Sequence, residues 1–308
     1  MSTLPSRQSA RSSLTEAFHR GRALAARPYG VLRGNRMGEI GGVILAVLLL
    51  LTVFGPTIAP HDPQAKQLND DNTVRSLEGP STTNPLGTTR YGRDVLSQLL
   101  VGARTALLVG FLTATIVVTI GTSVGLTAGY YGGYVDDILM RITDIVYGIP
   151  VLPFAIVVLT MLDRSVLFII LMLGLIYWRN CARVVRSEAI SLREEEFIES
   201  AETTGASSLR IVYRQLLPNV LPLSFLYFAF ATGWAIVTAA SVAFLGFGDP
   251  SRISWGRMMF AAWNTDSVLA QPFWIAAPGL MIMLTVSSVY MIGQTYEEVA
   301  NPRLQEGS

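Results

Sequence analysis

The sequence has little charge and almost none of the residues that usually carry catalysis. Among its 308 residues are one cysteine, Cys181, two histidines, His19 and His61, and one lysine, Lys66. A single cysteine excludes an internal disulfide, and two histidines so far apart in the sequence predict no metal site. The chain also lacks the G-x-x-x-x-G-K-[ST] phosphate loop, because its only lysine does not lie in this pattern. It is therefore not expected to be a standard ATPase by itself.

Patterns typical of enzymes are missing as well. The sequence has no H-E-x-x-H pattern, and Cys181 has no plausible histidine partner. We therefore expect no catalytic residues and no enzymatic activity. The net charge of +1 gives no indication of nucleic-acid binding.

Apolar residues dominate instead. They make up 51% of the chain against 15% charged residues, and the mean hydropathy is +0.44. A membrane-spanning helix needs about 20 mostly apolar residues to cross about 30 Å of hydrocarbon. Six stretches approach or exceed this length, which predicts an all-α integral membrane protein with six transmembrane helices at 40–59, 106–128, 138–162, 166–182, 221–247 and 273–292. The fourth is short, and its Arg179 and Arg183 are expected to reach towards an interface.

The arginines predict the orientation in the membrane. Seven precede the first span, against the acids Glu16 and Glu39: Arg7, Arg11, Arg20, Arg22, Arg27, Arg33 and Arg36. Because basic residues are retained on the cytoplasmic side, we expect a multi-pass protein of the inner cell membrane with both termini cytoplasmic. Residues 60–95 then lie outside, and residues 186–218 lie inside.

The inner segment 196–222, EFIESAETTGASSLRIVYRQLLPNVLP, predicts two short helices joined at a glycine. Gly205 is a favoured helix-ending residue, and Ser207 or Ser208 can cap the second helix. On the second helix an apolar stripe is expected, and two prolines mark the return to the membrane: Leu209, Val212, Tyr213 and Leu216, then Pro218 and Pro222. On the first helix, Phe197 and Ala201 share one face.

Two uses of this segment are open. Its apolar residues could lie on the protein's own inner ends or on lipid head groups. An acidic first helix suits an anionic leaflet poorly, however, and the small residues Ser200, Ala201 and Gly205 allow a partner to approach closely. Docking of the helices into a groove of a partner protein is the favoured interpretation.

The same residues resemble the signature loop of ABC-importer permeases, which reads E-A-A, three residues, G, nine residues, I, one residue, L-P. This chain has Ser200 in place of alanine and Gln215 in place of isoleucine. The resemblance implies coupling helices within 193–217 that sit in a cleft of an ATPase subunit. The docking residues that it implies are Glu199, Ser200, Ala201, Gly205, Ala206, Leu209, Leu217 and Pro218.

Other segments resemble the dipeptide, oligopeptide and nickel permeases of that class (DppC/OppC-like). They are 84–110, AFLGFG at 243–248 with SWGRMM at 254–259, and NPRL at 301–304. The first contains the extracytoplasmic motif Leu86, Gly87, Thr88, Gly92, Arg93 and Asp94. The chain departs from the family at Ala239, at Gln294 and at Asn301, where an acid is common.

The resemblance implies a type I ABC-importer permease fold and a subunit that forms half of an ATP-driven pathway for peptides. The implied partners are a homologous second permease, two ABC ATPase subunits, an extracytoplasmic substrate-binding protein and the lipid bilayer. ATP and Mg would be used by the ATPases, with no cofactor bound by this chain. Nickel or another small solute is the alternative substrate. An ion-coupled secondary transporter is the runner-up class, which the absence of charge in the second, fifth and sixth spans disfavours.

We accordingly expect four parts: a cytoplasmic basic segment at 1–39, the first span with its outer loop at 40–95, a permease core at 96–296 and a cytoplasmic tail at 297–308. The outer loop either contacts the binding protein or holds a local turn and ion pair at Arg90, Arg93 and Asp94.

Three further patterns concern packing. Glycines recur every four residues at Gly121, Gly125, Gly129 and Gly133, and at Gly34, Gly38 and Gly42, which favours close helix packing within the subunit over a contact between subunits. Asp136, Asp137, Arg141 and Asp144 are spaced for pairing along one helix. Pro150 and Pro153 are expected to kink the third span.

Overall fold

The computed structural model describes residues 35–300, and these residues are mostly helical. In chain order the helices are α3 (Arg36–Ile58), α4 (Val95–Tyr131), α5 (Gly133–Tyr147), α6 (Val151–Met161), α7 (Val166–Arg193), α8 (Glu196–Thr203), α9 (Ser208–Ile211), α10 (Leu217–Val242), α11 (Trp255–Asn264) and α12 (Phe273–Ala300). Two π-helical turns adjoin α10: η1 (Val212–Leu216) before it and η2 (Ala243–Phe247) after it. Among the described residues, the only β-pairing is two isolated bridges in the outer loop. The expected all-α fold is confirmed.

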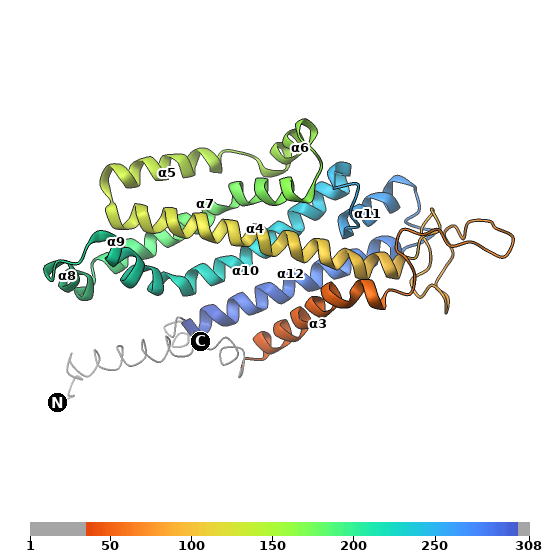
Figure 1. Ribbon diagram of the computed structural model, residues 1–308, viewed down its shortest axis with the longest axis horizontal. Helices are drawn as coiled ribbons and strands as arrows, with labels where there is room; N and C mark the ends of the chain where they lie inside the picture. Colours follow the sequence, from red (N-terminus) through yellow and green to blue (C-terminus); the bar gives the residue numbers. More distant parts are fainter. Residues whose placement is uncertain (1–34, 301–308) are drawn as a thin grey trace, which may run out of the picture.

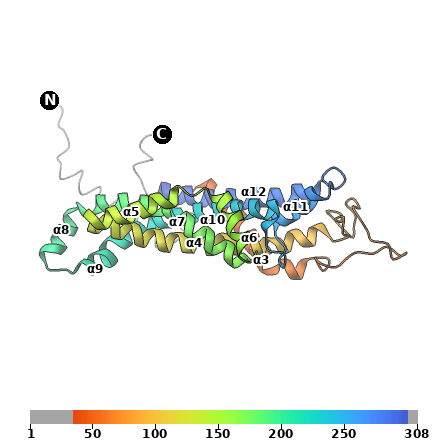
Figure 2. The ribbon, with the colours of Figure 1, turned by 90° about the horizontal axis from the view of Figure 1, so that it is seen from above.

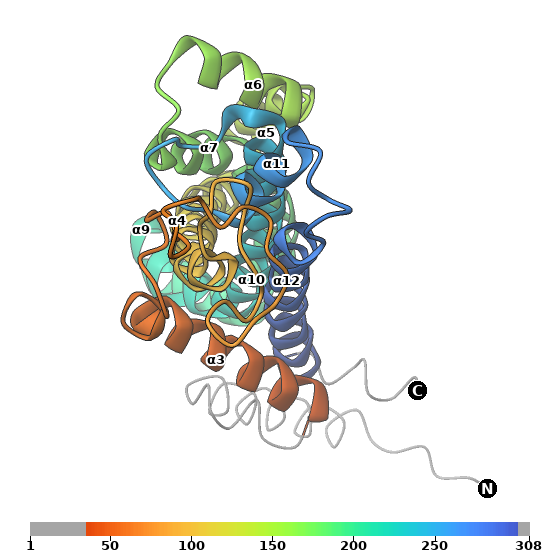
Figure 3. The ribbon, with the colours of Figure 1, turned by 90° about the vertical axis from the view of Figure 1, so that its right-hand side faces the viewer.

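The long helices run side by side along one axis (Figure 1). Seen along that axis, α4 and α10 are surrounded by α3, α12 and α7 (Figure 3), and α4 packs most extensively against α7. Helices α8 and α9 lie at one end of the bundle, which we call the α8 end. The loop 59–94 and α11 lie at the opposite end, which we call the loop end (Figures 1 and 2).

Several predictions fall outside the described residues. These are the arginines from Arg7 to Arg33, Gly34 and the NPRL sequence at 301–304.

Five helices are long and apolar enough to cross a membrane, or six spans if one bent pair is counted as a span. The five are α3, α4, α7, the continuous helix Ser208–Phe247 and α12. The third expected span, 138–162, is not one helix, because α5 and α6 meet at a bend of 81°. Pro150 has no N–H to continue α5 and disfavours helical geometry at Ile149, so the chain breaks there. Pro153 lies in the first turn of α6, where proline is tolerated.

The glycines at four-residue spacing pack helices within the subunit. A Cβ atom added to Gly125 would lie 2.6 Å from the carbonyl oxygen of Ala182 on α7, and one on Gly121 would lie 2.6 Å from the Cβ of Cys181. Gly38 meets Thr295 of α12 in the same way, whereas a Cβ on Gly133 would meet nothing within 4 Å. Close approach of α4 to α7 and of α3 to α12 therefore depends on small residues, and the prediction of packing within the subunit is confirmed for these pairs.

The acids of α5 pair with α7 and not along their own helix. Arg186 of α7 donates from its Nε and Nη2 atoms to the two carboxylate oxygens of Asp136, and Arg183 Nη2 lies 2.6 Å from Asp144 Oδ1. No pairing of Arg141 with Asp137 or Asp144 occurs within the described residues, so the expected pairs along the helix are wrong. The reason is that α7 lies beside α5 and presents arginines to it.

Arg179 is buried and does not reach an interface as expected. It is 8% exposed, it donates a hydrogen bond to the carbonyl oxygen of Val146, and its guanidinium lies 4.7 Å from the ring centroid of Tyr147. The last turn of α5 thus provides both an acceptor and a π face for this charge.

Candidate functional site

At the α8 end, the short helix α8 is attached to the bundle by two residues. Ile198 and Ala201 are 1% and 8% exposed, and they belong to a core cluster that also contains Leu192 of α7 and Ile211 of α9. This burial fixes one face of α8 and leaves the opposite face to solvent.

Gly205 forms the turn between α8 and α9, as the sequence predicts. Its φ of +81° is in the left-handed region. The N–H of Gly205 donates to the carbonyl oxygen of Glu202 at 2.9 Å, and the N–H of Ala206 donates to that of Ala201 at 3.0 Å. This is the Schellman arrangement that ends a helix at glycine. Ser207 is the N-cap residue of α9, although its side chain makes no capping hydrogen bond.

Exposed apolar side chains occur on both sides of this turn. Phe197 is 43% exposed, Leu209 65% and Tyr213 64%. The expected stripe of Leu209, Val212, Tyr213 and Leu216 on a single face is wrong, because Val212 and Leu216 are buried. Leu209 and Tyr213 are four residues apart and share the outer face of the helix, whereas Val212 and Leu216 share the inner one.

The second short helix is not separate from the membrane span. α9, η1 and α10 are continuous from Ser208 to Phe247, so Pro218 and Pro222 lie inside one helix and do not interrupt it. Pro218 lies just after the π-helical turn η1, so the backbone hydrogen-bond pattern of the helix changes just before the residue that lacks an N–H.

The other predicted docking residues differ in exposure. Glu199 and Ser200 are exposed, Ala201 is buried, and Ala206, Leu217 and Pro218 are partly buried. Sequence analysis missed Tyr130, whose hydroxyl donates to Glu202 Oε1 at 3.4 Å and links α4 to α8. No local pattern could reveal this contact, since the two residues are 72 positions apart.

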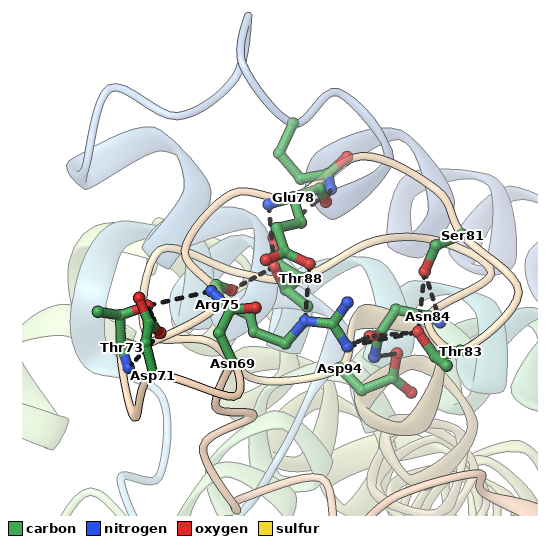
Figure 4. Close-up of polar contacts among 11 residues, drawn as sticks. Asn69, Asp71, Thr73, Arg75, Glu78, Ser81, Thr83, Asn84, Thr88 and Asp94 are labelled. Atoms are coloured by element: carbon green, nitrogen blue, oxygen red, sulfur yellow. Dashed lines mark hydrogen bonds and ion pairs between the residues drawn. The ribbon is translucent and has the colours of Figure 1, made fainter.

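At the loop end, Asp94 is fully buried and organises the start of α4 (Figure 4). Its carboxylate accepts hydrogen bonds from the N–H of Ser97 at 2.8 Å, the Ser97 hydroxyl at 2.5 Å and Asn84 Nδ2 at 2.9 Å. It is the N-cap residue of α4 and at the same time the anchor of the preceding loop.

Thr88 and its neighbours hold the rest of this loop together (Figure 4). The Thr88 hydroxyl accepts from the Glu78 N–H at 3.0 Å and donates to the Arg75 carbonyl oxygen at 2.5 Å. Arg75 Nε lies 2.8 Å from Glu78 Oε2. Gln271, which precedes α12, is 1% exposed and donates to the Glu78 carbonyl oxygen at 2.7 Å. The loop is thus attached to the start of α12.

Gly87 and Gly92 have structural roles in the loop. Both have positive φ, and a Cβ on Gly87 would lie 2.0 Å from Gln271 Nε2, while one on Gly92 would lie 2.5 Å from Val74 Cγ1. Leu86 packs against the core cluster of α3, α4, α11 and α12. These residues of the predicted motif therefore contribute to the folded conformation of the loop.

Of the turn and ion pair considered for Arg90, Arg93 and Asp94, only the turn is present. The N–H of Gly92 donates to the Thr89 carbonyl oxygen at 2.9 Å. Arg90 Nη1 donates to the carbonyl oxygen of Thr265 at 2.8 Å. Within residues 35–300, Arg93 forms no ion pair with Asp94, whose carboxylate accepts from Asn84 and Ser97 instead.

One motif that sequence analysis overlooked has no catalytic geometry. Residues 121–125 read G-T-S-V-G, which fits the G-x-S-x-G pattern of hydrolases. They lie in the middle of α4 and not at a strand-to-helix turn, and the Ser123 hydroxyl donates to the Thr119 carbonyl oxygen at 2.7 Å. The described residues also contain no group of three or more His, Cys, Asp or Glu placed to hold a metal ion.

Comparison with known proteins identifies the class. Residues 121–304 match the family described as binding-protein-dependent transport system inner membrane component, and residues 30–80 match the N-terminal transmembrane domain of oligopeptide transport permease C. The chain is 32% identical over 275 residues to a dipeptide transport system permease protein of Alkalihalophilus pseudofirmus, with 89% of this chain and 88% of the relative covered.

Two further relatives agree. An oligopeptide transport system permease protein of Bacillus subtilis is 27% identical over 275 residues, and a glutathione transport system permease protein of Escherichia coli is 33% identical over 274 residues. Each comparison covers 89% of this chain and 88% of the relative. The resemblance found in the sequence is confirmed, and so is the expectation that the chain is a transport component and not an enzyme. The chain belongs to the family of binding-protein-dependent transport system inner membrane components.

Proposed function

We propose that this chain is the permease subunit of an ATP-driven ABC importer and forms half of the pathway by which peptides cross the inner cell membrane. The observation that carries the proposal is the solvent-exposed turn at Gly205, with Phe197, Leu209 and Tyr213 exposed around it at the tip of the bundle. Apolar side chains held on a rigid helical frame and left without a cover suit helix-in-groove docking.

In the proposed orientation, the α8 end lies in the cytoplasm with both termini, and the loop end lies outside. The distribution of arginines supports this arrangement. The partners are a homologous permease, two ATPase subunits docked at the α8 end and a substrate-binding protein at the loop end. ATP and Mg bind to the ATPases, while this chain binds no cofactor. We keep the four parts expected from the sequence in this proposal: the cytoplasmic segment 1–39, the first span with its outer loop at 40–95, the permease core 96–296 and the cytoplasmic tail 297–308.

Peptides are the proposed substrate class because the relatives are named for the transport of dipeptides, oligopeptides and glutathione, which is itself a small peptide. These names favour peptides over nickel. The docking role is assigned to Glu199, Ser200, Ala201, Gly205, Ala206, Leu209, Leu217 and Pro218. Of these, the exposed residues would meet the ATPase directly, and the buried Ala201 would support α8 from beneath.

The continuous helix from α9 to α10 suggests how docking drives transport. Closure of the ATPases on ATP would displace α8 and α9, and the 40-residue helix Ser208–Phe247 would carry that displacement across the membrane. The hydrogen bond from Tyr130 of α4 to Glu202 of α8 would pass part of this displacement to α4.

Docking is tested with a charge placed on the exposed face. In Leu209→Glu, we expect at least about a tenfold decrease in the amount of ATPase subunit that co-purifies with the tagged chain in mild detergent, because loss of an apolar anchor costs about 2 kcal/mol or more. Mass spectrometry of the co-purified subunits measures this ratio.

The matched control is Leu269→Glu, since Leu269 is 96% exposed and lies between α11 and α12, at the loop end. It should retain the ATPases as wild type does. Equal retention by both variants would refute docking at α9, and a wild-type chain that purifies without any ATPase would refute the importer itself.

A further inference from the structure

The loop end contains a cavity of about 430 Å³. Its walls come from the outer loop, the start of α4, the residue Arg164 before α7, the segment from η2 through α11, and the start of α12. The volume is within the range of roughly 300–1,000 Å³ that is typical of small-molecule pockets.

The cavity lining carries only positive charge among the described residues. Arg93, Arg164 and Arg257 all line the cavity, and among the described residues no aspartate or glutamate does. Asp249 is close enough to influence Arg257, but its carboxylate accepts hydrogen bonds from Ser251 and from the N–H of Val166. Three guanidinium groups without an acid among them create a positive potential that favours an anion.

Arg257 and Arg164 are held in place by backbone carbonyl groups. Arg257 Nη1 donates to the carbonyl oxygens of Asp249, Pro250 and Arg252 at 2.9, 2.8 and 2.7 Å, and Arg164 Nη1 donates to that of Gly246 at 3.2 Å. Burial lowers the pKa of Arg257, the charge of Asp249 raises it, and the charge of Arg93 lowers it further. Neutral acceptors therefore fix both arginines, and the acid that acts on the charge of Arg257, Asp249, is not part of the cavity lining.

Two N–H donors in the lining have no acceptor. Arg93 Nε and the indole Nε1 of Trp274 are both inaccessible to solvent and form no hydrogen bond within residues 35–300. Trp274 is 1% exposed and lines the cavity together with Arg93. A buried donor without a partner costs about 1–3 kcal/mol, so both N–H groups gain when the side chains that cover them shift and a ligand in the adjacent cavity supplies acceptors.

We propose that this cavity binds a carboxylate, and that Arg93 and Trp274 donate to its oxygens while Arg164 and Arg257 supply positive charge. A planar carboxylate matches the paired donors of a guanidinium, which distinguishes it from a spherical anion. On the basis of the proposed function, we assign this carboxylate to the free C-terminus of an arriving peptide. Every unmodified peptide carries such a group.

Arg93 allows a clean test because, within residues 35–300, its guanidinium makes no hydrogen bond that a substitution would break. The full chain, purified with its co-purifying subunits and placed in nanodiscs without the binding protein, is titrated with radiolabelled alanyl-alanine and with the C-terminal amide of that dipeptide. We expect the free acid to bind at least about tenfold more tightly than the amide, a difference of about 1.4 kcal/mol.

The variants separate charge from structure. Arg93→Gln should weaken binding of the free acid about tenfold and leave the amide unchanged. Arg93→Lys should restore only part of the difference, because lysine supplies the charge without the paired donors. Trp274→Phe should weaken the free acid by a few fold. Arg90→Gln is the matched control, because Arg90 is on the same loop but does not line the cavity. It should bind both ligands as wild type does.

Equal affinity for acid and amide, or equal behaviour of Arg93→Gln and Arg90→Gln, would overturn the inference. Competition by inorganic phosphate as strong as that by the dipeptide would overturn the assignment to a peptide carboxylate. Uptake by the complete ATP-driven complex is measured in parallel. If the complex takes up peptide but the chain in nanodiscs binds acid and amide equally well, this inference is contradicted and the proposed function is not. If the complex takes up no peptide at all, the proposed function is contradicted.

Discussion

Gly205→Pro should reduce ATP-dependent uptake by a factor of about 100 or more, because proline at an incompatible position costs about 3 kcal/mol or more. Gly205 has a φ of +81°, whereas proline is restricted to a φ near −65°. The substitution also removes the N–H that donates to Glu202, and it disfavours the conformation of Thr204, whose ψ is 1°. Helix α9 would then leave its position relative to α8. Uptake into proteoliposomes, normalised to the amount of inserted protein, is the measurement.

Gly205→Asn is the control for this prediction. Asparagine tolerates the left-handed region, and a Cβ at position 205 would meet nothing within 4 Å. We therefore expect the Asn variant to retain most of the uptake. Unchanged uptake by a fully expressed Gly205→Pro protein would show that the turn does not couple the permease to its ATPases.

Asp94→Ala should lower the free energy of unfolding by about 3–5 kcal/mol, because two buried side-chain donors lose their acceptor, at about 1–3 kcal/mol each, and the loss of an N-cap adds about 1 kcal/mol. The carboxylate is fully buried, and its removal leaves the amide of Asn84 and the hydroxyl of Ser97 without their acceptor. The N-cap of α4 is lost as well. Thermal unfolding of the purified chain, followed by tryptophan fluorescence, measures the effect.

Two variants test the cause of that loss. Asp94→Asn keeps the shape and a capping oxygen, so it should be less destabilised than Asp94→Ala. Asp71→Ala removes an exposed carboxylate from the same loop, one that also accepts hydrogen bonds within its own turn, from Thr73, and it should unfold close to the wild-type temperature. If Asp94→Ala unfolds at the same temperature as Asp71→Ala, the outer loop does not depend on this carboxylate.

Features that depend on neighbours in the sequence could be predicted from the sequence. The lengths of the apolar stretches predicted where the long helices lie. In lipid, a backbone has no hydrogen-bond partners except its own groups, so an apolar stretch of this length must be helical. Gly205 was predicted to end a helix because the left-handed turn is a local property of glycine. The regular spacing of glycines likewise indicated close packing, although only the structure shows that α4 meets α7 and α3 meets α12.

The wrong predictions share one cause, which is competition from distant partners. Asp144 has Arg141 at suitable spacing on its own helix, yet it bonds to Arg183 of α7, and Asp136 bonds to Arg186 of the same helix, because guanidinium groups on a neighbouring helix can reach both carboxylates. The kink expected at Pro150 is present, and its size, 81° between α5 and α6, is a feature that the sequence did not predict. How far a proline break opens depends on what the two halves pack against, and the local sequence does not contain that information.

What the sequence by itself determined is the helical membrane class, the turn at Gly205 and the family resemblance, since each depends on residues close together along the chain. Only the tertiary structure decided which charges pair, which apolar residues stay exposed at the α8 end, and where Arg93, Arg164, Arg257 and Trp274 meet. Those four residues span 182 positions (93 to 274). They line one cavity because the loops that carry Arg93 and Arg164 lie at the same end of the bundle as α11 and the start of α12, and this arrangement arises only from long-range packing.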